Sequence, residues 1–349
     1  MRLAGISLLS LLCALAGGYI WFDGVNDGVA DTTLSIPLEL DEGPDWLEPV
    51  RPLPLTTQLD PQKVALGQRL FHDTRLSRDA TVSCASCHDL TAGGDDGRAV
   101  SAGVGGALGD VNAPTVFNSG FNFVQFWDGR AGTLEEQVNG PITHPREMGT
   151  DWPTVEMRLR GIPGYVADFE RLYDDGVTAR NIRDAIASFE RSLVTADSRF
   201  DRYLNGDTFA ITVEEREGYA FFKSFGCVSC HQGVNVGGNM FQKFGIMLAD
   251  RDADEPENPS DLGRFNVTGR QEDRHVFKVP SLRNVELTAP YFHDGSAPDL
   301  PLAVRVMAEM QLGQQLTERQ VSRIVAFLKT LTGSIPPTAQ PPIPVAASQ

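Results

Sequence analysis

Hydrophobic residues recur at the spacing of an amphipathic helix in several parts of the chain. Within residues 61–71, the positions that follow this spacing are Val64, Leu66, Leu70 and Phe71. Side chains three or four positions apart lie on one face of a helix, so this segment is predicted to be helical. A second helix is predicted from the capping-box pattern of Thr212 and Glu215 to Gly226.

Further helices are predicted between these two segments and after them. Helical periodicity continues over residues 155–173, where Pro163 and Gly164 separate two segments, and over residues 179–204. A last helix is predicted over residues 317–331, with a capping box at its start and a glycine after its end. The folded part of the chain is therefore predicted to be all-α.

The helices at 61–71 and 212–226 each lead into the same short motif. The two copies are Cys84-Ala85-Ser86-Cys87-His88 and Cys227-Val228-Ser229-Cys230-His231. The two thiols in this pattern are spaced to form thioethers with the vinyl groups of a heme, and the adjacent histidine is placed to bind the iron. The sequence therefore predicts two covalently bound c-type hemes.

Three other roles for these cysteines fit less well. Disulfides are the usual state of cysteine in an exported chain, but both pairs here have the same spacing and a following histidine. Zinc motifs bring all their ligands to one metal, and a redox dithiol gives no reason for a histidine in both copies. Heme attachment explains the complete pattern through Cys84, Cys87 and His88, and through Cys227, Cys230 and His231.

The repeat of helix and motif predicts two heme domains, at residues 51–205 and 206–334. Residues 1–22 contain an apolar stretch that is predicted to be a signal peptide or a membrane anchor. Residues 23–50 are predicted to be a linker, and the proline-rich residues 335–349 a disordered tail. This organisation predicts a periplasmic protein, either soluble after cleavage or anchored to the inner membrane.

The formal net charge of −16 at pH 7 narrows the choice of partner. An acidic chain is repelled by nucleic acid and by anionic membrane surfaces, whereas a basic protein would be attracted to it. Neither nucleic acid nor an anionic membrane surface is therefore expected as a partner.

The ligand opposite each motif histidine decides between electron transfer and catalysis, because a catalytic iron needs an open position. The candidates in the rest of the chain are His72, His144, His275, His293, Met148, Met157, Met240, Met247, Met307 and Met310. Met307 and Met310 follow the second motif at about the distance at which class I c-type cytochromes place an axial methionine. Such a ligand would raise the potential of the second heme; otherwise both methionines pack in a helix core.

Several further motifs accompany the two heme motifs. They are Leu66-Gly67-Gln68-Arg69-Leu70-Phe71, Arg75-Leu76-Ser77, Asn112-Ala113-Pro114-Thr115, Gln125-Phe126-Trp127-Asp128-Gly129-Arg130-Ala131, Glu147-Met148-Gly149 and Pro290-Tyr291-Phe292-His293. In their order and spacing, over residues 60–333, they resemble the bacterial diheme cytochrome c peroxidases. The resemblance implies two cytochrome c-like heme domains packed against each other.

The resemblance also implies a role for each heme. The first would be a low-potential peroxide site, and the second, with Met307 as its axial ligand, a high-potential site that receives electrons. Gln137 and Glu147 would line the peroxide pocket, and Trp127 would relay electrons between the hemes. Cleavage of the O–O bond needs a proton to leave one oxygen and reach the other, which Glu147 would do as general acid and base.

One calcium ion between the domains is implied in the same way. Its ligands would be the side chain of Asn112 and the backbone carbonyls of Thr288 and Pro290. Oxygen ligands of this kind suit calcium. Without the resemblance, the sequence gives no signal for this site.

The chain departs from the family at one position. The family's first heme is usually blocked at rest by a histidine, and the matching residue here is Val104. No histidine occurs between His88 and Asn112, and valine cannot bind iron. We therefore expect an open first heme that needs no reductive activation, unless His144, three positions before Glu147, supplies the ligand.

These inferences together predict a cytochrome c peroxidase that reduces hydrogen peroxide to water. Its electrons would come from a small redox protein, a cytochrome c or a cupredoxin. A homodimer is also compatible with the sequence. An alternative is a MauG-like enzyme that oxidises a partner protein, but such enzymes carry a tyrosine ligand where this chain offers Met307. The non-enzymatic alternative is a diheme electron carrier, which needs two six-coordinate irons.

Overall fold

The computed structural model describes residues 48–55, 58–247 and 258–342. The predicted signal or anchor segment, most of the predicted linker and the end of the predicted tail lie outside these residues. Among the residues that are described, no helix is both long and apolar enough to cross a membrane.

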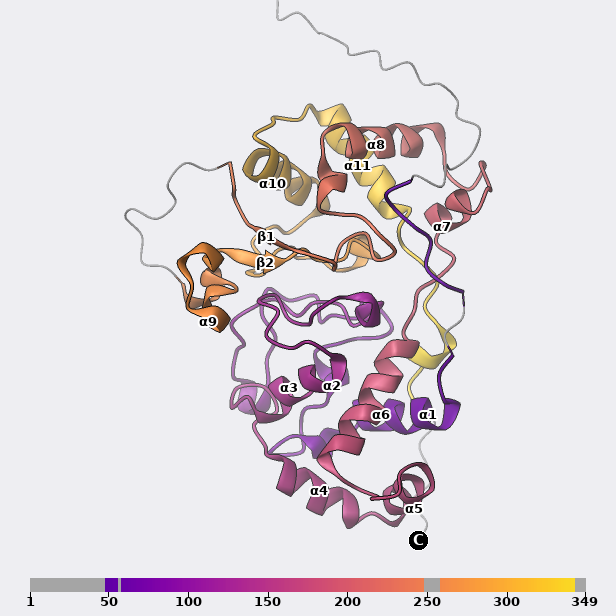
Figure 1. Cartoon of the computed structure of the whole chain (residues 1–349), viewed down its shortest axis with the longest axis vertical. Coiled ribbons are helices and arrows are strands. Elements are labelled where there is room, and N and C mark those ends of the chain that lie inside the picture. The colour runs from indigo at the N-terminus through magenta and orange to yellow at the C-terminus, as the bar shows by residue number, and fades with distance from the viewer. Residues whose placement is uncertain (1–47, 56–57, 248–257, 343–349) are drawn as a thin grey trace, which may run out of the picture. The chain divides into compact units, whose positions relative to one another are not determined.

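Helices form where the hydrophobic periodicity predicts them (Figure 1). Helix α1 (Pro61–Phe71) begins at Asp60, whose carboxylate accepts hydrogen bonds from the first free N–H groups of the helix. Helices α8 (Val213–Ser224) and α11 (Glu318–Lys329) both begin with the predicted capping box. Local sequence is sufficient at these positions because each cap satisfies backbone groups that the helix itself leaves unpaired.

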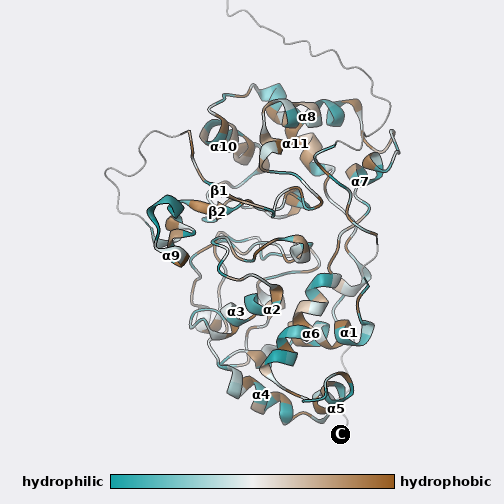
Figure 2. Ribbon diagram, viewed as in Figure 1, coloured by the Kyte–Doolittle hydropathy of each residue, from teal (hydrophilic) through white to brown (hydrophobic). Residues whose placement is uncertain are grey.

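The middle of the chain holds α4 (Trp152–Arg160), α5 (Pro163–Leu172), α6 (Ala179–Ser192) and α7 (Arg199–Leu204). The prediction of a continuous helical run over 179–204 is wrong, because the helix stops after Ser192. Asp197 has φ +63°, in the left-handed region, and Ser198 then caps the start of α7. Hydrophilic and hydrophobic residues share α4 and α6, as expected of helices with one buried face (Figure 2).

Several elements were not predicted. They are α2 (Leu134–Gln137), α3 (Asn139–Thr143), α9 (Phe265–Thr268), α10 (Leu300–Leu312), β1 (Phe241–Lys243) and β2 (Val276–Lys278). The strands pair antiparallel, with Phe241 opposite Lys278, and an all-α fold lacks such a sheet. Helices α2, α3 and α9 have only four or five residues, too few to show a period, and the strands pair across a long stretch of chain. Helix α10, with 13 residues, is long enough to show a period and was missed. The fold is nevertheless helix-rich.

Short 3-10 helices connect these elements. They are η1 (Thr74–Leu76), η2 (Cys84–Ser86), η3 (Val104–Gly106), η4 (Ser119–Phe121), η5 (Cys227–Ser229), η6 (Pro259–Leu262), η7 (Gln271–Asp273), η8 (Val285–Leu287) and η9 (Pro337–Ala339). Two of them, η2 and η5, each begin at the first cysteine of a heme motif and end just before its second cysteine.

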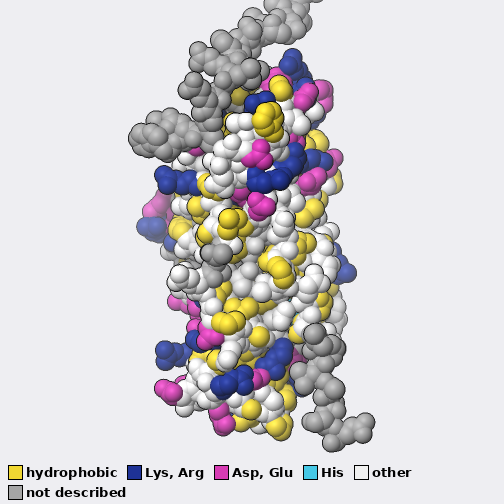
Figure 3. Space-filling model, turned by 90° about the vertical axis from the view of Figure 1, so that its right-hand side faces the viewer, with side chains coloured by type: hydrophobic (Ala, Val, Ile, Leu, Met, Phe, Trp, Pro, Cys, Tyr) yellow, Lys and Arg dark blue, Asp and Glu magenta, His cyan; other side chains and the backbone are white. Residues whose placement is uncertain are grey.

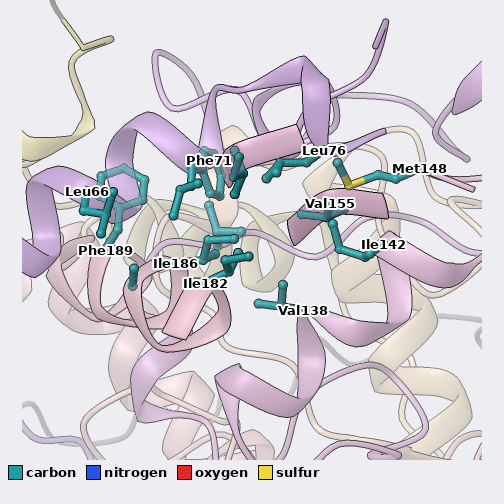
Figure 4. Close-up of a cluster of buried hydrophobic side chains, with 14 of the residues drawn as sticks. Leu66, Phe71, Leu76, Val138, Ile142, Met148, Val155, Ile182, Ile186 and Phe189 are labelled. Atoms are coloured by element: carbon teal, nitrogen blue, oxygen red, sulfur yellow. The ribbon is translucent and has the colours of Figure 1, made fainter. Parts of the chain in front are cut away.

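Buried hydrophobic side chains gather into two clusters. The first lies around α1 and α6 (Figure 4) and includes Leu66, Phe71, Leu76, Val138, Ile142, Val155, Ile182, Ile186 and Phe189. The second lies around α8 and α11 and includes Phe200, Tyr219, Phe222, Ile324, Phe327 and Leu328. Each cluster lies beside one heme motif, since Cys84 packs against the first and Cys227 against the second.

The same helix contact occurs in both clusters. Gly67 on α1 faces α6 so closely that a Cβ atom there would lie 1.9 Å from the carbonyl oxygen of Ala185. Gly218 on α8 faces α11 in the same way, with 1.9 Å to the carbonyl oxygen of Arg323. Four residues beyond each glycine, Phe71 and Phe222 come within 6.4 Å, between ring centroids, of the motif histidines. The sequence repeat is therefore a repeat in three dimensions.

The first and the last described segments each pack against the cluster of the other half of the chain. Val50 belongs to the second cluster, and the Leu53 N–H donates to Asp201 at 3.3 Å, although the domain prediction places residues from 51 onward in the first domain. At the other end, Ala339 belongs to the first cluster, and Gln68 donates to the Thr338 carbonyl at 2.9 Å. Residues 338 and 339 of the predicted disordered tail are thus packed. Their partners lie far away in sequence, which is why the local composition did not predict these contacts.

The glycine contact can be tested by adding one methyl group. We expect Gly67→Ala to lower the free energy of unfolding by about 1–3 kcal/mol, because the helix pair must separate to admit the Cβ. Gly164→Ala is the control: nothing lies within 4 Å of that Cβ position, and the gain in helix propensity is about 1 kcal/mol at most. Guanidinium unfolding of both holoproteins measures the difference. Equal stabilities would refute the close contact.

Candidate functional site

The first motif follows α1 and is held by its own backbone. Cys84 to Ser86 form η2, and the His88 N–H donates to the Cys84 carbonyl at 3.0 Å. The His88 Nδ1 atom lies 3.0 Å from the Gly94 carbonyl oxygen, which orients the ring so that Nε2 points away from this contact. Burial lowers the pKa of His88, so the imidazole is neutral and its Nε2 can bind iron.

The second motif repeats this arrangement. Cys227 to Ser229 form η5, and the His231 Nδ1 atom lies 3.4 Å from the Val236 carbonyl oxygen. Burial lowers the pKa of His231 to about 4, which keeps this imidazole neutral as well. The four described cysteines, two in each motif, form no disulfide. Two free thiols and a neutral, oriented histidine at each site are the groups that a c-type heme needs.

A cavity of about 240 Å³ lies beside the second motif. Its walls include Cys227, Cys230, His231 and Met307, so the structure brings the predicted methionine to the predicted attachment site. Met310, on the same helix α10, instead lines a second cavity with His275 and His293. The thiols, the imidazole and the thioether sulfur around one largely apolar space fit a heme.

Glu147 is half-buried, with 39% of its side chain exposed, and its Oε1 atom lies 3.4 Å from Nδ1 of His144. Burial raises the pKa of Glu147, whereas the nearby His144, Arg130 and Arg146 lower it and Asp110 raises it further. The pKa of the Cys87 thiol is raised mainly by burial, and the charge of Glu147 contributes to that shift. The charge of Glu147 therefore acts on a thiol of the first motif.

The loop at Val104 packs directly against the segment that carries Glu147. The Val104 N–H donates to the Glu147 carbonyl at 2.8 Å, and a Cβ on Gly103 would lie 2.1 Å from the Arg146 carbonyl. The Val104 side chain is buried. The position that matches the family's blocking histidine is thus next to Glu147, and here it presents only an apolar side chain.

Trp127 and the three predicted calcium ligands lie along the cavity at the second motif. Asn112, Thr288 and Pro290 all contribute to its wall. The Trp127 indole N–H donates to the Asn112 carbonyl at 2.9 Å, and the Asn112 side chain donates to the Arg98 carbonyl at 2.8 Å. The structure therefore gathers residues that are up to 178 positions apart, counting from Asn112 to Pro290.

Gln137, the other residue predicted for the peroxide pocket, lies on a different element from Glu147. It ends α2, whereas Glu147 follows α3, and no hydrogen bond joins their side chains in the part of the chain that the structure describes. The remaining histidines make protein contacts: His72 with the Gln68 carbonyl, His275 with the Asp261 carbonyl, and His293 with the Asp261 carboxylate at 2.7 Å. These contacts support structural roles for them.

Sequence reasoning missed Lys278, which lines the cavity at the second motif. A lysine between the hydrophobic residues Val276, Phe277 and Val279 was the available signal, because a charged residue in an apolar run needs a partner.

On the face seen in Figure 3, basic and acidic side chains lie close together. The negative net charge is therefore not gathered into one patch on that face.

These features define a class: a helix-rich protein with two heme-attachment motifs in different surroundings. A family model described as di-haem cytochrome c peroxidase matches residues 61–209. The cytochrome c peroxidase Ccp of Escherichia coli (strain K12) is 48% identical over 295 residues, which are 84% of this chain and 63% of that protein. The chain belongs to the di-haem cytochrome c peroxidase family.

Other relatives agree with this assignment. The cytochrome c551 peroxidase of Nitrosomonas europaea is 46% identical over 298 residues, covering 85% of this chain and 88% of that protein. The crystal structure of a MauG-like protein associated with microbial copper homeostasis has a TM-score of 0.73 at 29% identity, covering 86% of this chain and 98% of that one.

The different positions of Met307 and Met310 lead to a spectroscopic test. We expect Met307→Ala to abolish the charge-transfer absorption band of a methionine-bound ferric heme, because Met307 lines the same cavity as His231. Met310→Ala, on the same helix, should retain the band. The reverse result would assign the ligand to Met310.

Proposed function

We propose that this protein is a peroxidase that reduces hydrogen peroxide to water with electrons from a small redox protein. The observation that carries the proposal is Glu147, a half-buried carboxylate with a raised pKa, beside a loop whose Val104 offers no iron ligand. The names of the relatives at 46–48% identity support the same activity.

Each half of the chain holds one heme as a cytochrome c-like domain, and the two domains pack against each other. Residues 51–205 form the peroxide domain, with covalent attachment at Cys84 and Cys87, and residues 206–334 form the electron-transfer domain, with attachment at Cys227 and Cys230. The histidine after each pair binds the iron. When bound, the hemes supply the redox chemistry of the iron, which carries the two electrons that peroxide requires.

Glu147 moves the proton that cleavage of peroxide requires. It accepts a proton from one oxygen of hydrogen peroxide and returns it to the other oxygen, which leaves as water. Two further protons and two electrons convert the remaining oxygen into the second water, so hydrogen peroxide, two protons and two electrons yield two waters. His144, 3.4 Å from the carboxylate, positions it and lowers its pKa. Gln137 lines the same pocket.

Electrons enter through the second domain. Met307 and His231 would hold the iron of the second heme, and a methionine and histidine pair would raise its potential so that it favours reduction. Trp127 lies on the wall of the cavity and relays electrons towards the first domain. One calcium ion, bound by the Asn112 side chain and the Thr288 and Pro290 carbonyls, ties the domains together.

The protein acts in the periplasm, where c-type hemes are attached. The uncharged apolar stretch within residues 1–22 directs export, either as a cleaved signal or as an anchor in the inner membrane. A cytochrome c or a cupredoxin serves as donor.

A second candidate function is oxidation of a partner protein by a MauG-like mechanism. It is favoured by the likeness to a MauG-like crystal structure and by the absence of a blocking histidine near Val104. Peroxide-dependent oxidation of reduced cytochrome c, measured by stopped flow, separates the two functions. Rapid turnover supports the peroxidase, whereas peroxide consumption without cytochrome oxidation would favour the alternative. A pure electron carrier would consume no peroxide.

Glu147→Gln should lower kcat/KM for peroxide by about 10²–10⁴-fold, because the amide cannot move the proton. Glu136→Gln, at an exposed carboxylate on α2, is the control and should keep wild-type activity. A wild-type rate in the Glu147 variant would exclude the acid–base role.

The pH dependence of the rate should follow the same group. Only the carboxylate form accepts a proton, so activity rises as pH passes the raised pKa of Glu147. His144→Asn removes the neighbour that lowers this pKa most, and should therefore move the acid limb of kcat/KM to higher pH. An unchanged acid limb would contradict the interaction.

Val104→His should convert the first heme from high spin to low spin in the oxidised protein, because it restores a nitrogen ligand at the matching position. Activity should then require prior one-electron reduction. Val104→Ala is the control and should stay high spin. Electron paramagnetic resonance of the resting proteins measures both, and a low-spin first heme in the wild type would refute an open site.

A further inference from the structure

Lys278 is a buried cation on the wall of the cavity at the second motif. It ends β2, where its backbone N–H donates to the Trp127 carbonyl at 2.8 Å and its residue pairs with Phe241 on β1. Only 5% of the residue is exposed. The same cavity is lined by Cys227, Cys230, His231 and Met307.

The ammonium group of Lys278 makes no hydrogen bond or ion pair with any residue that the structure describes. Burial alone lowers its pKa to about 8. A buried cation without a partner is unfavourable, and lysine is rarely buried unless it is paired. The chain has 46 acidic residues, yet none of those in the described part of the chain is paired with this ammonium.

Arg283 shows how this protein pairs a buried cation by itself. Its side chain is fully buried, donates to the Asp201 carboxylate at 2.7 Å, and also donates to the Val234 and Arg51 carbonyls. All three nitrogen atoms of its guanidinium thus donate to acceptors from the chain. Lys278, at nearly the same burial, meets none among the residues that the structure describes, so the cavity that it lines is the place to look for its partner.

The occupant that the surrounding residues fit is a heme, and its charged groups define the partner. A heme carries two propionate carboxylates, and these lie at the edge opposite the vinyl groups that Cys227 and Cys230 would hold. A carboxylate in an apolar cavity is stable only with a cation or several hydrogen-bond donors around it. A single ammonium with free donors supplies that partner.

We propose that the Lys278 ammonium binds a propionate of the heme in the second site. The inference rests on the proposed function, which places that heme at Cys227 and Cys230. The added positive charge stabilises the reduced iron, so Lys278 and Met307 act in the same direction on the potential. Because the Lys278 backbone is bonded to Trp127, this contact also fixes the propionate edge of the heme on the Trp127 side of the cavity.

The test compares Lys278→Met with Lys243→Met in the holoprotein. Lys243 lies on the neighbouring strand β1 and is exposed, so its loss changes the net charge equally without touching the cavity. Redox titration follows the heme whose ferric form carries the methionine charge-transfer band. We expect a lower midpoint potential in Lys278→Met than in the wild type, and a wild-type value in Lys243→Met. Equal potentials in both variants would overturn the proposal.

A second measurement does not depend on a variant that folds. Resonance Raman spectra of the wild-type holoprotein report the hydrogen bonding of the propionates through their bending modes, and the second heme is isolated by half-reduction. We expect one propionate in a strong charged hydrogen bond, and a shift of that mode in Lys278→Met and in the polar variant Lys278→Gln. Two propionates with the modes of water-exposed groups would overturn the proposal.

The heme count separates this inference from the function on which it rests. Two covalent hemes per wild-type chain, measured as pyridine hemochrome, establish the second site whatever Lys278 does. With two hemes, an unchanged potential and an unchanged propionate mode would refute the Lys278 contact alone. Fewer than two hemes would refute the attachment at Cys227 and Cys230 itself.

Discussion

The contact of a helix glycine with a backbone carbonyl on a second helix supports each motif of two cysteines and a histidine. Gly67 brings α1 onto α6 at Ala185, and Gly218 brings α8 onto α11 at Arg323. Any side chain there would separate the two axes, because protein interiors have no free volume to absorb it. The second motif follows α8 directly, and the first follows α1 after η1. Each motif histidine lies near a phenylalanine of the helix that precedes its motif. The positions of the motif thiols and imidazoles thus depend on glycine, which has no side chain, at positions 67 and 218.

The two sites share this frame and differ in what faces the histidine. At the second site α10 presents the Met307 sulfur, and the cavity is otherwise mostly apolar. Near the first site the loop at Val104 and the carboxylate of Glu147 lie together, with no sulfur or imidazole from that loop. In the proposed function, the copy that faces Met307 transfers electrons and the copy beside Glu147 reduces peroxide. The difference lies in α10 and in the loop at Val104, not in the helix pairs α1–α6 and α8–α11.

Buried charge is treated in two ways in this protein. Arg283 is satisfied within the chain by Asp201 and backbone carbonyls, and it joins residues 51, 201 and 234 into one network. Lys278 has no such partner among the described residues, and the proposed propionate contact would supply one. A charge that the protein itself leaves unpaired is thus informative about what the protein binds.

The sequence by itself determined the features that depend on neighbouring residues. The capped helices α1, α8 and α11 and the two heme motifs are set by contacts within a few positions, so pattern and spacing were sufficient. The break after Ser192, the pairing of β1 with β2 and the packing of Ala339 against α1 depend on partners far away in sequence. The same holds for the site: its cysteines were readable, but the choice of Met307 over Met310 rested on family resemblance, and the environment of Lys278 was decided only by the tertiary structure. Burial and cavity walls are properties of residues brought together from the whole chain, and no local pattern encodes them.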